Sequence, residues 1–211
     1  EKHDSIENTI AIHDLHFAKY YNENIDLYKK KYNFQKYKTF QLIKPIKLLK
    51  PPGLGSAYLE YYNNKLFIIS ADGKIAYTGK FDGENIRFKH LKSNIKDLII
   101  YNNFYSSTQN NQGFSIKDLF IYDNKIFISY VNQVKEDCYN TSILVSDLKY
   151  DFLKFEKLFD PEECVSTSNK DKEFSAHSSG GRMVYYKNDE ILLSVGDYRF
   201  RKNSQNKSSI F

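Results

Sequence analysis

The sequence predicts an all-β protein in which one four-stranded pattern recurs along most of the chain. Aromatic residues make up 16% of the 211 residues, as 18 Tyr and 16 Phe without Trp, and Tyr and Phe favour strands. Short apolar runs are joined in pairs by polar turns that contain Asn, a residue that tolerates left-handed backbone angles. Other runs alternate apolar with charged residues, which indicates half-buried strands.

The first fifty residues differ from this pattern and are expected to form a separate segment, 1–50, of helical and extended structure. Ser5 can cap a helix that runs to about Lys31, because a hydroxyl accepts a hydrogen bond from an unpaired N–H of the first turn. The run Pro51-Pro52-Gly53 then interrupts regular structure before the repeats begin. The predicted boundary therefore separates this segment from a β domain over 51–211.

A repeat of this length in a sequence indicates an architecture of similar consecutive units. Its hairpin occurs at 56–70, 115–129 and 181–194, with Lys65 and Lys125 60 residues apart and Lys125 and Glu190 65 apart. In the first two copies two further strands follow, at 75–79 and 86–91 in one copy and at 143–147 and 153–158 in the other. Each complete unit therefore predicts four consecutive antiparallel strands.

Four-stranded units that recur in this way are typical of a β-propeller. The sequence then holds a partial β-propeller, with two four-stranded blades and half of a third, preceded by the N-terminal helix. The expected insertions between strands are 94–113, 132–140 and 160–180. Closed propellers need about four to eight blades, so we expect the chain to be the front part of a longer protein. The alternative is a β-sandwich whose hairpins resemble one another.

The charge pattern excludes some functions and leaves others open. Lys and Arg outnumber Asp and Glu by 31 to 26, a net charge of +5, but the basic residues are scattered, which favours a solvated surface over a nucleic-acid site. We therefore expect no nucleic-acid partner. No run approaches the roughly 20 apolar residues of a transmembrane helix, and no residue spacing indicates a metal site.

The third hairpin carries the candidate site. His177 lies in a Gly/Ser loop before a strand and Asp197 ends the strand pair, so an antiparallel hairpin brings both to one end of the sheet. A neutral imidazole can take a proton from a hydroxyl, and a carboxylate can stabilise the imidazolium. The alternative is an exposed loop histidine beside a turn-forming aspartate.

The run His177-Ser-Ser-Gly-Gly-Arg182, followed by a strand pair and Ser194-Val-Gly-Asp197, resembles the glucose/sorbosone dehydrogenase family. These proteins are soluble six-bladed β-propellers and include aldose sugar dehydrogenases that depend on pyrroloquinoline quinone (PQQ). The resemblance implies that His177 is the base that removes the hydroxyl proton, that Asp197 supports it, and that Arg182 is the arginine of the motif. Gln205 matches a substrate- or cofactor-binding position in a later segment of the family.

The resemblance also implies a function. It predicts a periplasmic or secreted sugar or alcohol dehydrogenase that transfers hydride from a sugar hydroxyl to PQQ, with any calcium ligands beyond residue 211. Cys138 and Cys164, with 25 residues between them, can be free thiols or a disulfide from their spacing alone. Export by resemblance favours the disulfide. The alternative function is a non-catalytic propeller that binds glycans or protein partners.

Overall fold

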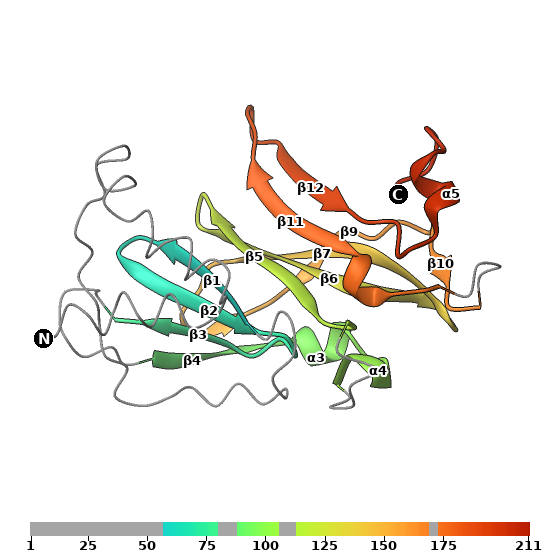
Figure 1. The fold of residues 1–211 in the computed structure, drawn as a ribbon. Coiled ribbons are helices and arrows are strands. Elements are labelled where there is room, and N and C mark those ends of the chain that lie inside the picture. The colour runs from blue at the N-terminus through green and yellow to red at the C-terminus, as the bar shows by residue number, and fades with distance from the viewer. Residues whose placement is uncertain (1–56, 80–87, 106–112, 169–172) are drawn as a thin grey trace, which may run out of the picture. The chain divides into compact units, whose positions relative to one another are not determined.

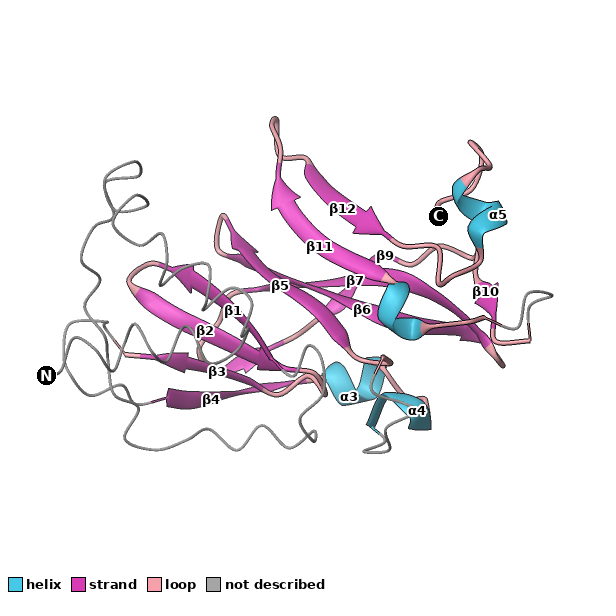
Figure 2. Ribbon diagram, in the orientation of Figure 1, coloured by secondary structure: helices cyan, strands magenta, loops and turns pink. Residues whose placement is uncertain are grey.

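The computed structural model describes residues 57–79, 88–105, 113–168 and 173–211 (Figure 1). All of them belong to one compact unit, Gln41–Phe211. The expected N-terminal helix lies outside the described residues and stays a prediction, as does the domain boundary at residue 50. Strands dominate the described part, and its helices are a few residues long (Figure 2). The all-β prediction is confirmed.

The first sheet is the predicted four-stranded unit. It consists of β1 (Ala57–Tyr62), β2 (Lys65–Ser70), β3 (Ile75–Thr78) and β4 (Phe88–Ser93). Each strand pairs antiparallel with the next in chain order. A fifth strand, β8 (Phe152–Leu153), joins β4 in parallel from the second repeat.

The second sheet repeats this order with longer strands. It contains β5 (Ile116–Tyr122), β6 (Lys125–Lys135), β7 (Cys138–Asp147), β9 (Glu156–Phe159) and β10 (Val165–Ser166). Strands β5, β6, β7 and β9 pair antiparallel in succession, and β10 pairs with the beginning of β7. The third sheet is the hairpin β11 (Gly180–Tyr185) and β12 (Ile191–Val195).

The tight turns follow from their residues. In the first hairpin Asn63 and Asn64 have φ of 48° and 58°, and in the second Asp123 and Asn124 have φ of 45° and 56°. Two successive residues with positive φ make the type I′ turn, whose twist matches that of the strands it joins. Asn and Asp reach this conformation more readily than other residues with a side chain, so the predicted turns are confirmed.

Two expectations about the second repeat are wrong. The stretch 132–140 is not an inserted loop, because β6 and β7 continue through it and turn at Glu136–Asp137. The expected strand 153–158 is also divided. Its beginning belongs to β8, which pairs with β4 of the first sheet, and its end belongs to β9.

The middle sheet is buried on both faces. Strands β6 and β7 are buried along nearly their whole length, as expected of strands covered on two sides. One face shares a core with the first sheet, formed among others by Ile69, Ile75, Leu119 and Ile128. The other face packs on the third sheet through Phe127, Val145 and Met183. The first strands of the three repeats lie in sequence, with β5 in contact with both β1 and β11.

Short helices follow the sheets. They are α3 (Ile95–Leu98), α4 (Asn102–Tyr105), the 3-10 turn η2 (Ala176–Ser178) and α5 (Arg201–Ser204). The turn η2 comes directly before β11 and contains His177. A second core of aromatic residues lies behind it, with Phe114, Tyr139 and Tyr198 buried.

Candidate functional site

The loop that carries His177 is shaped by a glycine pair. Gly180 and Gly181 have φ of 71° and 115°, a region that residues with a Cβ rarely enter. A Cβ on Gly181 would also overlap the side chain of Lys117 on β5. The Ser129 hydroxyl donates a hydrogen bond of 2.5 Å to the carbonyl of Gly181. The glycines therefore let β11 begin against β5 and β6, directly after η2.

A second segment lies against the same loop. The backbone N–H of Gly196 donates to Ser179 O at 2.8 Å, and that of Ser175 donates to Tyr198 O at 3.0 Å. The Tyr198 hydroxyl is buried and forms a hydrogen bond of 3.0 Å with the Thr141 hydroxyl of β7. These bonds hold the turn after β12 beside η2, as the antiparallel hairpin predicts.

His177 is exposed on η2. Partial desolvation lowers the pKa of His177 below its usual value of 6.5, and the positive charges of Lys117 and Arg199 lower it further. Lys117 is close by, since its Nζ donates to the carbonyl of Ala176 at 3.0 Å. A lowered pKa leaves the imidazole neutral near pH 7, which is the form able to accept a proton.

Asp197 lies on the neighbouring turn. Its Oδ1 accepts the backbone N–H of Arg199 at 2.8 Å, a local bond that Asp commonly makes in turns. Among the described residues, no hydrogen bond joins Asp197 to His177. The structure thus brings the two residues to adjacent segments without pairing them.

Arg182 has a partner that the sequence did not predict. Its guanidinium donates to Asp118 Oδ1 on β5 at 3.0 Å, and Asp118 Oδ2 accepts the backbone N–H of Met183 at 2.7 Å. The Asp118 side chain is 2% exposed and that of Arg182 is 69% exposed. Burial raises the pKa of Asp118, while both hydrogen bonds and the Arg182 charge oppose that rise. The signal in the sequence was the charged pair Lys117-Asp118 inside an apolar strand.

Gln205 is exposed directly after α5. Within the described part of the chain, no hydrogen bond joins its side chain to His177, Asp197 or Arg182. The structure brings the other three predicted residues to the beginning of β11 and the turn beside it, and it adds Lys117, Asp118 and Arg199.

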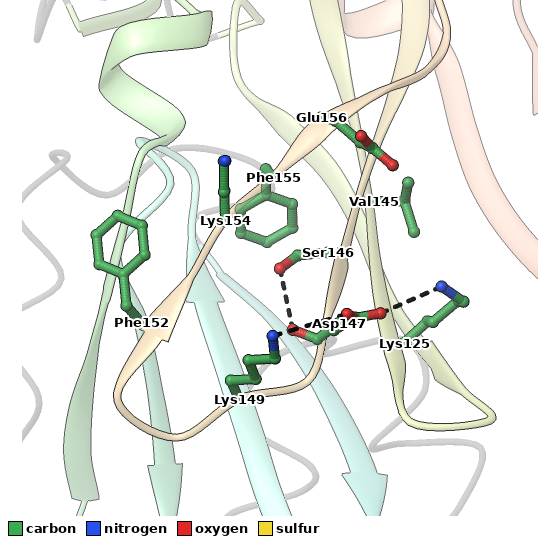
Figure 3. A pocket seen from close by; sticks show the side chains of 9 residues that line it. All are labelled: Lys125, Val145, Ser146, Asp147, Lys149, Phe152, Lys154, Phe155 and Glu156. Carbon is green, nitrogen blue, oxygen red and sulfur yellow. Dashed lines mark hydrogen bonds and ion pairs between the residues drawn. The ribbon is translucent and has the colours of Figure 1, made fainter.

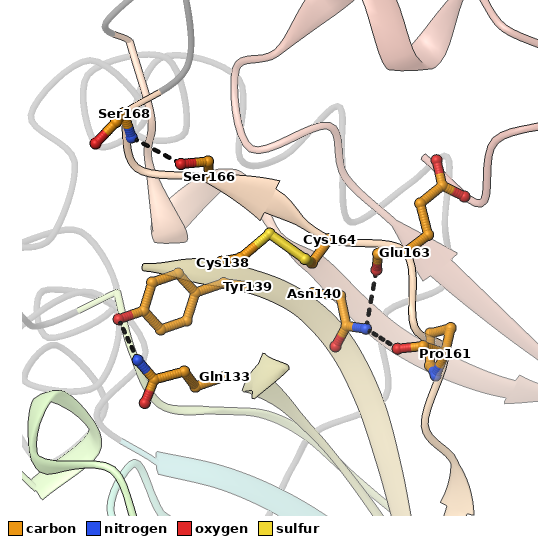
Figure 4. The surroundings of a disulfide bond; sticks show 9 residues. All are labelled: Gln133, Cys138, Tyr139, Asn140, Pro161, Glu163, Cys164, Ser166 and Ser168. Carbon is orange, nitrogen blue, oxygen red and sulfur yellow. Dashed lines mark hydrogen bonds between the residues drawn. A yellow bond between two sulfur atoms is a disulfide. The ribbon is translucent and has the colours of Figure 1, made fainter. Parts of the chain in front are cut away.

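The disulfide between Cys138 and Cys164 is present, with Cα atoms 5.5 Å apart (Figure 4). Beside it the amide of Asn140 donates to the carbonyls of Pro161 and Glu163, at 2.6 and 3.1 Å. The carboxylate of Glu163 in turn accepts the Ser209 hydroxyl and the Ile210 N–H. The cross-link therefore fixes the segment between β9 and β10 to the beginning of β7.

A hollow of about 260 Å³ lies at the other end of β7 (Figure 3). Asp147 pairs there with Lys125 at 3.2 Å and Lys149 at 3.9 Å, and all three side chains are more than half exposed. Exposed ion pairs of this kind contribute little. This hollow is separated from His177 by the length of β7, whose beginning contacts the His177 loop through Thr141.

Comparisons with known proteins identify structures of similar fold, but they do not assign the chain to a family. No family model and no curated protein matches the sequence. A crystal structure of a glucose dehydrogenase matches 72% of the chain at 13% identity with a TM-score of 0.50, and a second glucose dehydrogenase matches 72% at 12% identity with a TM-score of 0.49. The chain covers 41% and 44% of these proteins, so it corresponds to less than half of their length. At such identities the likeness concerns the fold alone.

Proposed function

We propose that the three sheets are consecutive blades of a β-propeller and that the chain is part of a sugar or alcohol dehydrogenase. Three features support the propeller. The first strands β1, β5 and β11 contact one another in sequence, the middle sheet is buried on both faces, and the fold resembles that of a glucose dehydrogenase. In a propeller each blade packs face to face on the next.

The observation that carries the proposed reaction is the exposed position of His177 on η2, beside the turn that contains Asp197; its lowered pKa is consistent with a neutral imidazole. In this reaction the proton of a substrate hydroxyl passes to a ring nitrogen of His177. The hydride on the same carbon would leave to a two-electron acceptor, so that the alcohol becomes a carbonyl. Asp197 on the adjacent turn would stabilise the imidazolium as it forms.

PQQ is the cofactor that this proposal requires, and it would supply the acceptor for the two electrons of the hydride. The site fits it in charge, because PQQ is an acid and the guanidinium of Arg182 is largely exposed at the beginning of β11. Arg182 would hold an acid group of the quinone, with Asp118 fixing its position, and Gln205 would contribute an amide. Calcium is proposed to bind beyond residue 211; the described residues contain no cluster of three or more His, Cys, Asp or Glu that could hold a metal ion.

The proposed location is the periplasm or the exterior of the cell. The disulfide supports it, because disulfides persist in oxidising compartments. The proposed partner is a small sugar or alcohol. Within the part of the chain that the structure describes, no helix is long and apolar enough to cross a membrane.

The test is His177→Ala in the complete protein, assayed with aldoses, PQQ and a dye as final acceptor. We expect kcat to fall about 100-fold or more, because a general base contributes at least that factor, while the affinity for PQQ is unchanged. The acid limb of kcat/KM in the wild type is expected below pH 6.5, since the pKa of His177 is lowered.

The matched control is His90→Ala, which removes another exposed histidine, from β4. It should leave activity unchanged. If His177→Ala retained full activity, His177 would have no part in the reaction.

The second candidate function is glycan or partner binding without catalysis. It is favoured by tyrosines on the third hairpin, where the Tyr185 and Tyr186 side chains are 42% and 50% exposed and Tyr185 stacks on Tyr122 at 4.5 Å. Exposed rings can stack on sugars. Glycan binding that survives His177→Ala and disappears in Tyr185→Ala would select this function.

A further inference from the structure

A second hollow, of about 430 Å³, lies beside the tip of the hairpin formed by β6 and β7. Its volume falls within the range of pockets that hold small ligands. The described residues that line it belong to the segment 98–101, to the end of β6 and its turn within 132–136, and to β9 at Lys157. None of these residues is part of the site of His177, so the hollow is a separate feature of the surface.

One wall of this hollow is apolar. Ile99 is 1% exposed and anchors its segment in the core shared by the first two sheets, and the residues on either side of it, Leu98 and Ile100, line the hollow. Ile100 is 79% exposed. The next residue, Tyr101, also lines the hollow and is held by a hydrogen bond from its hydroxyl to the carbonyl of Val131. The wall therefore offers an apolar surface on which CH groups of a ligand can pack.

Asn132 supplies a hydrogen-bond acceptor from a buried position. It is 8% exposed yet lines the hollow, and its Nδ2 donates to Asp160 Oδ1 at 2.8 Å. Because a carboxylate only accepts hydrogen bonds, the amide nitrogen is fixed on that side, and the amide oxygen accepts none from the residues that the structure describes. This oxygen is still accessible, since the buried side-chain atoms without a partner in the described part are the hydroxyls of Tyr105 and Tyr130.

Gln133 adds a second amide to the lining. Its Nε2 donates to the Tyr139 hydroxyl at 3.3 Å, and within the described ranges its oxygen accepts no hydrogen bond. Each of the two amides thus has its nitrogen occupied and its oxygen available. A ligand that pairs with both must donate hydrogen bonds.

The charges around the hollow balance one another. Lys135 and Glu136 are exposed and of opposite sign, and Lys157 pairs with Asp160 at 2.5 Å. An anionic ligand would bring further acceptors to the two amide oxygens, and a cationic ligand would meet the lysines. A neutral ligand rich in hydroxyls has neither disadvantage, because a hydroxyl both donates and accepts.

We propose that this hollow binds a neutral saccharide, at a site that is independent of the proposed reaction. Sugar hydroxyls would donate to the oxygens of Asn132 and Gln133 and accept from Lys135 Nζ. The CH groups of the sugar ring would pack on Leu98 and Ile100. This division matches small-ligand sites, in which apolar walls provide contact area and a few polar groups fix the orientation.

The experiment records methyl and side-chain amide NMR spectra of the complete protein while cellobiose is added. The Ile100 methyl group and the amide groups of Asn132 and Gln133 are the reporters. We expect saturable shifts of these signals in the wild type and in His177→Ala alike, because the two sites are separate. Fully O-methylated cellobiose, which keeps its acceptors and lacks every O–H, and sodium sulfate, an anion without donors, should shift none of them.

Two variants test the lining, with binding followed at the amide signals that remain. Gln133→Ala should weaken cellobiose binding about fivefold, the effect of one neutral hydrogen bond. Ile100→Asp should weaken it at least as much, because it places a charge on the apolar wall. Leu59→Asp is the matched control, since it makes a similar change on β1 at a leucine that is 56% exposed, and it should leave binding unchanged. If Gln133→Ala fails to fold, the exposed Ile100→Asp still decides the question.

Unchanged reporter signals with cellobiose would overturn the proposal. Equal shifts from the O-methylated sugar or from sulfate, or full binding in both variants, would do the same. Loss of the shifts in His177→Ala would also overturn it, because the sugar would then bind at the site of that histidine. Cellobiose binding at the hollow of a protein that oxidises no aldose would refute the dehydrogenase and leave this inference standing. Oxidation of aldoses without any shift at Ile100 would do the reverse.

Discussion

The first and second sheets share one topology and differ in length, and the difference lies where the site is built. Strands β2 and β3 have six and four residues, whereas β6 and β7 have 11 and 10. The added residues of β7 include Cys138 of the disulfide and Thr141. The Thr141 hydroxyl donates to Ser179 O at 2.7 Å and forms a hydrogen bond with the Tyr198 hydroxyl. The shorter sheet is a packing unit, while the longer one also supports the His177 loop.

The largest effect is expected from the disulfide at the tip of the longer hairpin. Replacing Cys138 and Cys164 by Ser should lower the free energy of unfolding by about 3 kcal/mol, because the cross-link closes a loop of 26 residues in the unfolded chain. Unfolding in denaturant measures this change in the free energy of unfolding. Hydrogen exchange should accelerate near Tyr139 and remain unchanged in β2 and β3.

Wild-type protein treated with a reductant is the control and should show the same loss. If the amides of the first sheet lost protection equally, the two sheets would unfold as one unit, and the comparison between them would fail.

A smaller effect is expected at the contact between the second and third sheets. Asp118→Ala should cost about 2 kcal/mol, because it leaves the Met183 N–H buried without an acceptor. Asp147→Ala is the matched control at the exposed end of β7, where the loss of its ion pairs should cost less than about 0.5 kcal/mol. Thermal or urea unfolding of both variants measures the difference, and equal costs would show that Asp118 does not hold the two sheets together.

The smallest effect tests the support behind His177. Tyr198→Phe removes the hydroxyl that bonds Thr141 and should cost about 1 kcal/mol. Tyr61→Phe, in the first sheet, removes a hydroxyl whose hydrogen bond to Asn64 Oδ1 is exposed to solvent, and it should cost less than about 0.5 kcal/mol. Unfolding free energies of the two variants measure the contrast. If the Tyr198→Phe protein were as stable as the wild type, the buried hydrogen bond to Thr141 would not stabilise this loop.

The local features of the fold could be predicted because their causes lie within a few residues. The turns at Asn63-Asn64 and Asp123-Asn124 are encoded by residues that accept positive φ. The strands beside them are encoded by apolar runs. The hairpin that places His177 and Asp197 on neighbouring segments follows from the same pattern.

The errors in the prediction concern polar residues whose partners are distant. The predicted insertion 132–140 is one such error, because Asn132 and Asn140 are buried in strands, where their amides donate to Asp160 Oδ1 and to the carbonyls of Pro161 and Glu163. The pairing of β8 with β4 joins segments about 60 residues apart. No local pattern indicates such a partner, because it is chosen by packing between sheets.

The sequence by itself determined the strand class, the hairpins and their turns, because side-chain alternation and turn chemistry act over a few neighbouring residues. Only the tertiary structure decided that Arg182 pairs with Asp118 and that Lys117 Nζ donates to the carbonyl of Ala176, beside His177. These contacts join residues of different repeats, and burial sets their strength. The charges around the candidate base therefore depend on how the sheets pack against one another, which the order of residues along one strand does not contain.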